Sequence, residues 1–285
     1  MADQATVERL ERAALDVKLE LLKLCNQTLI HIGGDLSVAD MMTAIWQYAM
    51  HYDAKNPKWE ERDRFILSKG HAAAVTSFSQ AAIGCYDVAD IGKEYATDFG
   101  RFGMHSCNLI NPYVEVSTGS LGHGFPVATG IAAAIKKKKL SNSRVYVVMG
   151  DGEQQEGSIW EAAMTAAHYK LGNLIGFVDK NGLSFDGRVE EIMGIEPLGD
   201  KWRAFGWNVV EIDGHSMEEL VNAIDNLPSP GSDVPTVIIG DTEKGHGVGF
   251  MTNSVPWHAG MVDDEHYEKA AEELQSAYEQ KWGGK

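Results

Sequence analysis

Asp151 stands between two glycines in GDGEQQEG (150–157), directly after the apolar run VYVVM. A carboxylate at the end of a buried strand is a hard oxygen ligand for Mg²⁺ or Ca²⁺, and glycine on each side lets the backbone approach a bound group. Asn181 follows a second apolar run, NLIGFVD, and can add an amide oxygen. Because a few protein oxygens leave such an ion with open positions, the pattern predicts a metal ion that also binds a diphosphate and water.

Both fragments also have an ordinary structural interpretation. GDG and NG are typical of tight turns, and an isolated copy of either is more often a turn than a ligand site. They become informative together only if the fold brings the ends of their two strands to one edge. The elements around them therefore decide between a turn and a site.

Strands and helices alternate along the chain. Short apolar runs predict strands at 64–68, 144–149, 173–179, 207–212 and 235–240. Amphipathic or small-residue stretches predict helices at 7–25, 39–50, 72–84, 126–135, 158–169, 201–205, 217–227 and 263–282. This order is typical of an α/β fold in which helices flank both faces of a parallel sheet. Since ligands bind beyond the carboxyl ends of such strands, Asp151 and Asn181 are expected to face one another across a crevice.

Three local patterns refine this outline. His71 follows the strand RFILS and is expected at a strand-to-helix turn. SVAD (37–40) has the form of a capping box, in which Ser37 and Asp40 would satisfy the first amides of the next helix. KKKK (136–139) is expected to be a solvated helix end, because the helix dipole favours cations there.

Composition narrows the class of protein. The 285 residues are 44% hydrophobic and 23% charged, which is typical of a globular protein with one large α/β core or two small ones. The 41 acidic and 25 basic residues give a net charge of −16, which disfavours a nucleic-acid partner. With neither an internal repeat nor a linker in the pattern, residues 1–285 are expected to form one domain with helical N- and C-terminal extensions.

Cysteine usage and hydropathy predict the compartment. The three cysteines, Cys25, Cys85 and Cys107, share no metal-ligand spacing and are expected to be reduced thiols. Apolar runs are all shorter than a membrane span, and the N-terminal helix is charged rather than a signal peptide. A cytoplasmic protein without a membrane partner is therefore expected.

Seven blocks, taken in order, resemble the N-terminal half of transketolase. They are HIGGDLS (31–37), ILSKGHAA (66–73), STGSLGHG (117–124), GDGEQQEGSIWEA (150–162), DKNGLSFDG (179–187), EIDGHS (211–216) and the WH of SVPWHAG (254–260). GDG followed by an asparagine after a second strand is similar to the thiamine diphosphate motif. The resemblance implies a thiamine diphosphate-binding fold and a Mg²⁺ or Ca²⁺ ion.

The resemblance also implies particular ligands. Asp151, Asn181 and the backbone carbonyl of Leu183 match the metal ligands of the family, and Gly152 matches a glycine that packs against the diphosphate. The residues expected around the cofactor are His71, Gly119, Ser120, Leu121, Gly122, Gly150, Gly152, Glu153, Asn181 and His258. The side chain of Glu153 has no counterpart of known role, and we expect it to be solvated.

Catalytic roles are implied for four histidines and one glutamate. His31, His71, His105 and His258 match family histidines that line the channel to the cofactor and contact substrate, and imidazole suits that role because its pKa lies near neutrality. Each histidine alone is more often structural. Glu156 matches a glutamate at the family's subunit interface, although a glutamate that starts a helix is also stabilised by the helix dipole.

Two departures from the family concern the substrate pocket. The sequence around His105 is MHSCN in place of the family's usual sequence. Because residues 104–112 differ in this way, the identity of the substrate stays open. His246 stands in KGHGVGF where lysine is common, and we expect it in a polar pocket.

The resemblance implies a missing half. In the family, the glutamate that activates the aminopyrimidine lies in a second domain, and this chain is expected to lack it. We therefore expect one component of a split transketolase, paired with a separate C-terminal subunit in an assembly with two copies of each. Its reaction would move a two-carbon ketol unit from a ketose, usually phosphorylated, to an aldose.

Two other interpretations stay open. The α chain of a 2-oxo-acid dehydrogenase also belongs to a split thiamine enzyme, although HIGG, SKGH and SLGHG argue against it. A non-catalytic paralogue could keep the fold, although the retention of Asp151, Asn181 and four histidines argues against that.

Overall fold

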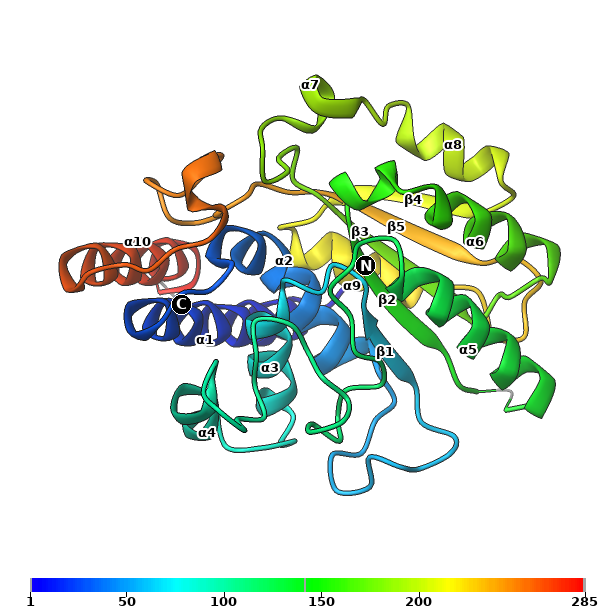
Figure 1. The fold of residues 1–285 in the computed structure, drawn as a ribbon, viewed down its shortest axis with the longest axis horizontal. Helices are drawn as coiled ribbons and strands as arrows, with labels where there is room; N and C mark the ends of the chain where they lie inside the picture. The colour runs from blue at the N-terminus through cyan, green and yellow to red at the C-terminus, as the bar shows by residue number, and fades with distance from the viewer. Residues whose placement is uncertain (1, 141, 284–285) are drawn as a thin grey trace.

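Five parallel strands form the central sheet of the computed structural model, which describes residues 2–140 and 142–283 (Figure 1). The strands are β1 (Arg64–Leu67), β2 (Val145–Gly150), β3 (Leu174–Lys180), β4 (Asn208–Asp213) and β5 (Thr236–Asp241). Their order across the sheet is β1-β2-β3-β5-β4, and every neighbouring pair is parallel. All five carboxyl ends therefore lie at one edge.

Helices pack on both faces of this sheet (Figure 1). One face carries α2 (Ile32–Ala44), α3 (Ala73–Ala82) and α9 (Met217–Asp225), with α1 (Gln4–Gln27) packed against these three helices and α10 (Asp264–Trp282) packed on α1. The other carries α5 (Gly124–Lys138), α6 (Gly157–His168) and α8 (Leu198–Ala204). The shorter elements are a π-helical turn (Ile45–Ala49), α4 (Val88–Glu94), α7 (Val189–Met193) and the 3₁₀ turns Gly152–Gln155 and Val255–His258.

The period-two geometry of a strand divides the apolar residues between two cores. In β2, Val145, Val147 and Met149 pack under α5 and α6, whereas Tyr146 and Val148 pack under α1, α2 and α3. This continuous apolar run is buried on both sides, as expected for a strand inside a parallel sheet. The predicted α/β fold and its alternation are confirmed, with element ends shifted by a few residues.

The predicted capping box at SVAD is wrong. Ser37 and Asp40 lie inside α2, which begins six residues earlier than the helix start that the pattern predicts, and both are buried. Ser37 Oγ donates to Asp179 at 2.6 Å, and Asp40 accepts from Lys18 Nζ and His215. These polar side chains bond tertiary partners, a use that the local pattern does not distinguish from capping.

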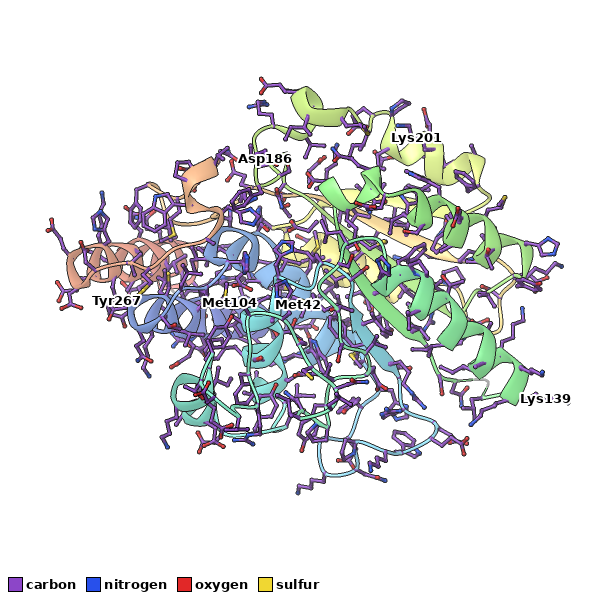
Figure 2. The ribbon with its side chains drawn as sticks, in the orientation of Figure 1. Met42, Met104, Lys139, Asp186, Lys201 and Tyr267 are labelled. Carbon is purple, nitrogen blue, oxygen red and sulfur yellow. The ribbon has the colours of Figure 1, made fainter. Side chains whose placement is uncertain are left out.

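The lysine run behaves as predicted. Lys136, Lys137 and Lys138 form the exposed last turn of α5, and Lys139 ends the helix in the left-handed conformation. Figure 2 shows Lys139 at the far end of α5, away from the carboxyl edge of the sheet. Among the described residues, no helix is both long enough and apolar enough to cross a membrane.

Candidate functional site

Four of the five strands are followed by polar residues at the carboxyl edge of the sheet. β1 runs into Ser68, Lys69 and His71, β2 into Asp151, β3 into Asn181, and β5 into Thr242 and Lys244. Gly150 and Asp179 are register partners of β2 and β3, and the Asp151 amide donates to the Asp179 carbonyl at 3.1 Å. The adjacent strand ends therefore bring Asp151 and the Asn181 loop together, as the sequence predicts.

A cavity of about 250 Å³ opens at this edge. The residues assigned from sequence that line it are His71, Gly119, Leu121, Gly150, Asp151, Gly152, Glu153, Asn181, Leu183 and His258. Ser120 is exposed and Gly122 is buried, and neither lines the cavity. The structure therefore gathers most of the expected cofactor residues around one space.

Asp151 is one of two acidic residues that line this cavity, with Glu153, and it is 3% exposed. Its Oδ1 accepts from the Gly152 amide at 2.7 Å, and its Oδ2 accepts from the Gly182 amide at 2.5 Å across the strand gap. Burial, followed by the charge of Asp179, raises the pKa of Asp151 to about 6. A cation bound here would favour the charged form of Asp151 and would lower its pKa.

Asn181 is held by hydrogen bonds at both ends of its side-chain amide. Its Nδ2 donates to Asp179 Oδ2 at 3.0 Å, and its Oδ1 accepts from the Leu183 amide at 3.1 Å, which leaves that oxygen a second lone pair for a ligand. Leu183 lines the same cavity, and its carbonyl accepts from Lys244 Nζ at 3.0 Å. Carboxylate, amide and carbonyl oxygens from adjacent turns make an all-oxygen donor set, which fits Mg²⁺ or Ca²⁺.

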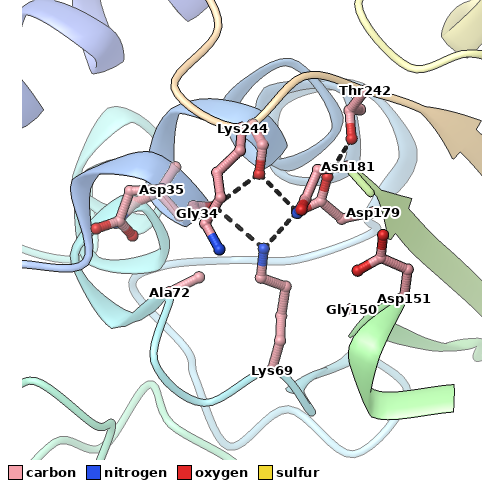
Figure 3. A network of polar contacts seen from close by, with 12 residues as sticks. Gly34, Asp35, Lys69, Ala72, Gly150, Asp151, Asp179, Asn181, Thr242 and Lys244 are labelled. Carbon is pink, nitrogen blue, oxygen red and sulfur yellow. Dashed lines mark hydrogen bonds and ion pairs between the residues drawn. The ribbon is translucent and has the colours of Figure 1, made fainter. Parts of the chain in front are cut away.

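Lys69 and Asp179 form an ion pair at the base of the cavity (Figure 3). Both are almost fully buried, and Lys69 also donates to the Gly34 carbonyl at 3.1 Å. Asp179 additionally accepts from Ser37, Asn181 and Thr242. Burial alone would raise the pKa of Asp179, but the Lys69 charge and these hydrogen bonds hold it below the ordinary value.

Lys244 brings a second positive charge to the cavity and is 2% exposed. Its Nζ lies 2.7 Å from His258 Nδ1, so the lysine donates and the neutral imidazole keeps its proton on Nε2. Burial, and then the charge of Lys69, lower the pKa of Lys244 to about 8. A bound anionic group would be attracted to both lysines.

The four predicted histidines lie together. The ring centroids of His31, His71 and His258 are 5.4 to 5.6 Å apart, and His105 lies 6.0 Å from His31. His31 and His71 stand at the starts of α2 and α3, His105 lies on an exposed loop, and His258 ends a 3₁₀ turn. Residues far apart in sequence therefore form one cluster, in which His71 and His258 line the cavity and His31 and His105 do not.

Three of these rings are neutral near pH 7. Burial, then the neighbouring His105 and the two lysines, lower the pKa of His31 to about 4. Burial, and then Lys244, lower the pKa of His258 to about 3, and burial with Lys69 lowers that of His71 well below its ordinary value. A neutral imidazole can donate from one nitrogen and accept at the other, as hydrogen bonding to sugar hydroxyls requires.

Glu153 corrects one expectation, because its side chain is 1% exposed and not solvated. The 3₁₀ turn after Asp151 folds it back between the strand ends. Its Oε1 accepts from Ser68 Oγ at 2.5 Å and the Gly122 amide at 2.9 Å, and its Oε2 accepts from the Gly150 amide at 3.2 Å. Burial raises its pKa. Glu153 thus ties together three turns that line or adjoin the cavity.

Glu156 is exposed at the start of α6, beside the loop that contains Gly122. Gly122 has a φ of +78°, and a Cβ there would lie 2.6 Å from the Cβ of Glu156. Only glycine fits this approach. Glu156 makes no side-chain cap to α6, and the residue is exposed to solvent.

His246 lies outside this cavity, in a separate pocket with the polar residues Lys18, Asp40 and His215. Its ring stacks on His215 at 3.4 Å, and Asp40 lies beside them. His215 Nδ1 bonds Asp40 at 3.0 Å, while its Nε2 accepts from the Glu243 amide at 2.9 Å. Since both nitrogens of His215 are used and Lys18 pairs with Asp40, this cluster is a structural clamp rather than a metal site.

Sequence reasoning missed several cavity residues, namely Gly34, Lys69, Ser184, Phe185 and Lys244. Lys69 lies inside the quoted block ILSKGHAA, and Lys244 begins KGHGVGF. Both lysines closely follow predicted strands. Their position at the carboxyl ends of these strands could have indicated that they line the site.

Comparison with known proteins identifies the family. Residues 23–281 match the family described as transketolase, thiamine diphosphate binding domain. The chain therefore belongs to this family, and the thiamine diphosphate-binding fold predicted from sequence is confirmed.

Two relatives of similar length are named as transketolase subunits. One, from the apulose-4-phosphate transketolase of Phocaeicola vulgatus, is a subunit 40% identical over 253 residues, covering 87% of each chain. The 6-deoxy-6-sulfo-D-fructose transketolase subunit SqwG of Clostridium sp. is 37% identical, covering 90% of this chain and 93% of that one. The transketolase of Campylobacter jejuni superposes with a TM-score of 0.84 at 28% identity over 96% of this chain. This chain spans only 43% of that solved chain.

Proposed function

We propose that this chain, as one diphosphate-binding domain over 1–285, is the N-terminal subunit of a split, thiamine diphosphate-dependent transketolase. The observation that carries the proposal is the cavity at the carboxyl edge, where Asp151, Asn181 and Leu183 offer oxygens beside Lys69 and Lys244. An oxygen donor set next to two lysines fits a divalent cation together with a diphosphate. Mg²⁺ or Ca²⁺ would be held by the three oxygens.

One group of residues is proposed to bind the cofactor, and a second group, the histidines, to contact the substrate. Lys69 and Lys244 attract the diphosphate, Gly152 admits it, and Leu121 supplies an apolar wall for the rings. When bound, thiamine diphosphate supplies the carbon nucleophile that carries the two-carbon unit.

His31, His71, His105 and His258 meet the substrate. Each imidazole can hold a sugar hydroxyl or move a proton at a substrate oxygen, which is the usual role of histidine in acid–base catalysis. Glu156 is exposed and is proposed to meet an adjoining subunit.

A partner subunit is supported by two observations. Leu109 is 89% exposed on the loop that bears His105, and Phe185, 68% exposed, packs edge-on against His258 at the cavity. Large apolar side chains around a binding site are typical of a surface that another protein covers. Two relatives of similar length are also named as subunits. We propose two copies of this chain with two of a C-terminal subunit.

The donor is proposed to be a ketose with an anionic end, and the acceptor an aldose. The support is that the named relatives carry the names of a phosphorylated and a sulfonated sugar. The cytoplasm is the proposed location, since Cys25, Cys85 and Cys107 are free thiols.

Co-expression with a candidate C-terminal subunit tests this function. The purified complex is given Mg²⁺, thiamine diphosphate and a panel of phosphorylated and sulfonated ketoses with aldose acceptors. Two-carbon transfer by the complex, absent from this chain alone, is expected. Oxidative turnover of a 2-oxo acid would favour the dehydrogenase alternative, and an inert complex that binds the cofactor would favour a non-catalytic paralogue.

A further inference from the structure

Asp35 is a fully buried acid that the proposed reaction does not use. It lies in the first turn of α2, next to Gly34, and Figure 3 shows it close to Ala72 at the start of α3. Its Oδ1 accepts from the Val75 amide at 3.1 Å, whereas its Oδ2 has no hydrogen-bond partner among the described residues. A buried carboxylate with one bond calls for an explanation.

The Val75 amide belongs to the first turn of α3, whose amides have no partner within the helix. The residue at the usual capping position is Ala72, which has no side chain able to accept a hydrogen bond. Asp35 therefore supplies from α2 the cap that α3 does not supply itself. A negative or polar oxygen at this end is also favoured by the helix dipole.

The same residue is bonded to the start of its own helix. The Asp35 amide donates to the His31 carbonyl at 3.0 Å, and the next residue back, Gly34, lies against the His71 ring. A Cβ built on Gly34 would lie 3.4 Å from His71 Nε2 and 3.7 Å from Lys69 Nζ. α2 and α3 thus meet where both begin, and both histidines stand at those beginnings.

We propose that Asp35 is a positioning residue that fixes the distance between His31 and His71 by capping α3 from α2. The two ring centroids are 5.4 Å apart, and no other side chain of the described residues bonds a first-turn amide of α3. Without the cap, the turn that bears His71 can move relative to His31. A displacement of about 1 Å in a positioned group can cost about 100-fold in rate.

Two substitutions separate capping from packing. Asp35→Asn keeps an oxygen that can accept from Val75, whereas Asp35→Ala removes it. Met41→Ala is the matched control, because Met41 is equally buried in α2 but faces Gly214 and Gly240, away from α3.

The inference rests on the proposed function, in which His31 and His71 contact substrate. The first measurement is therefore independent of activity: the histidine ring resonances of the full chain, recorded by NMR with labelled histidine. Asp35→Ala is expected to shift the His71 resonances, while Asp35→Asn and Met41→Ala leave them in place. Unshifted His71 resonances in Asp35→Ala would overturn the positioning role.

The second measurement uses the complex with the C-terminal subunit. Asp35→Ala is expected to lower kcat by about 10- to 100-fold with a smaller change in the KM for sugars, and Asp35→Asn to restore kcat to within about threefold. Equal losses in Asp35→Asn and Asp35→Ala would overturn the capping role. A wild-type complex without transfer activity would instead count against the proposed function, and the NMR comparison would still stand.

Discussion

Two buried lysine–aspartate pairs hold α2 in place, and their surroundings differ. Lys18 of α1 donates to both oxygens of Asp40 at 2.7 and 2.8 Å, and His215 supplies the third bond. Lys69 also pairs with Asp179, but it donates further to the Gly34 carbonyl and lines the cavity. The Lys18–Asp40 pair lies outside the cofactor cavity. The Lys69–Asp179 pair contacts residues that line this cavity, such as Asn181.

The difference shows how one kind of interaction serves two purposes. Burial alone would raise the pKa of Asp40, but Lys18 and His215 hold it well below its usual range, so this carboxylate is charged throughout the physiological range. Asp179 shares its charge among Lys69, Ser37, Asn181 and Thr242, and thereby orients the Asn181 amide toward the cavity. Loss of either ion pair should lower the free energy of unfolding. Only loss of the Lys69–Asp179 pair should also weaken cofactor binding.

Removing one lysine at a time tests this division most strongly. Lys69→Met and Lys18→Met should each lower the free energy of unfolding by about 3–5 kcal/mol, because each leaves a buried carboxylate without its cation. Urea denaturation measures both losses. Calorimetry on the folded fraction should then find weakened thiamine diphosphate binding in Lys69→Met alone. Equal weakening in Lys18→Met would show that the two pairs do not differ in function.

Substitution of a histidine that lines the cavity should lower turnover, whereas substitution of a histidine near the Lys18–Asp40 pair should not. His71→Ala and His258→Ala should each lower kcat of the complex by about 10- to 1000-fold, the range of typical acid–base and positioning contributions. His246→Ala is the control, since its ring stacks on His215 outside the cavity. Steady-state assays check this, and wild-type rates in both cavity variants would make those histidines structural.

Glu153 provides a test with a smaller effect. Glu153→Gln should cost about 1–3 kcal/mol, because the new amide group would turn a donor toward backbone amides that now donate to the carboxylate. Glu190→Gln, on an exposed glutamate paired with Arg188, should change stability by less than about 0.5 kcal/mol. Thermal and urea unfolding compare them. A neutral effect of Glu153→Gln would mean that the three observed bonds contribute no net stability.

A pH dependence from Asp35 provides a further test. Burial, partly offset by the Val75 amide and the Lys69 charge, raises its pKa to about 7. The unfolded value is about 3.9, so between the two the folded state binds more protons and stability falls as pH rises, by at most about 1.4 kcal/mol per unit.

Other groups near Asp35 should not mask this effect. The pKa values of Cys25 and Tyr95 are raised by burial, away from this range. Urea unfolding from pH 4 to 7 should show the wild type losing stability relative to Asp35→Asn. Parallel curves for the two proteins would contradict the raised pKa.

Much of this fold could be predicted from sequence because its rules are local. Apolar runs such as RVYVVM are buried on both faces, and alternation with helices implies parallel strands whose carboxyl ends coincide. That single inference placed Asp151 near Asn181. The resemblance then placed four histidines that no spacing rule could have brought together, three of them inside the seven blocks.

The missed features depend on tertiary contacts. Ser37 and Asp40 match a capping pattern, but the helix begins earlier at Ile32, and their partners lie far away in sequence. Glu153 looks solvated beside three other polar residues, yet three donors from separate turns converge on it. Lys244 and His246 are two residues apart and face different clusters, which is a matter of loop geometry alone.

The central claim is that Asp151 anchors a metal-bound diphosphate at the carboxyl edge of the sheet. Calorimetric titration of thiamine diphosphate into the complex, at limiting and at saturating Mg²⁺, tests it directly in the wild type and in Asp151→Ala. The account predicts that the wild-type affinity rises with Mg²⁺ and that the variant loses this dependence, because its remaining ligands are neutral oxygens. Unchanged affinity of Asp151→Ala at limiting Mg²⁺ would contradict the account.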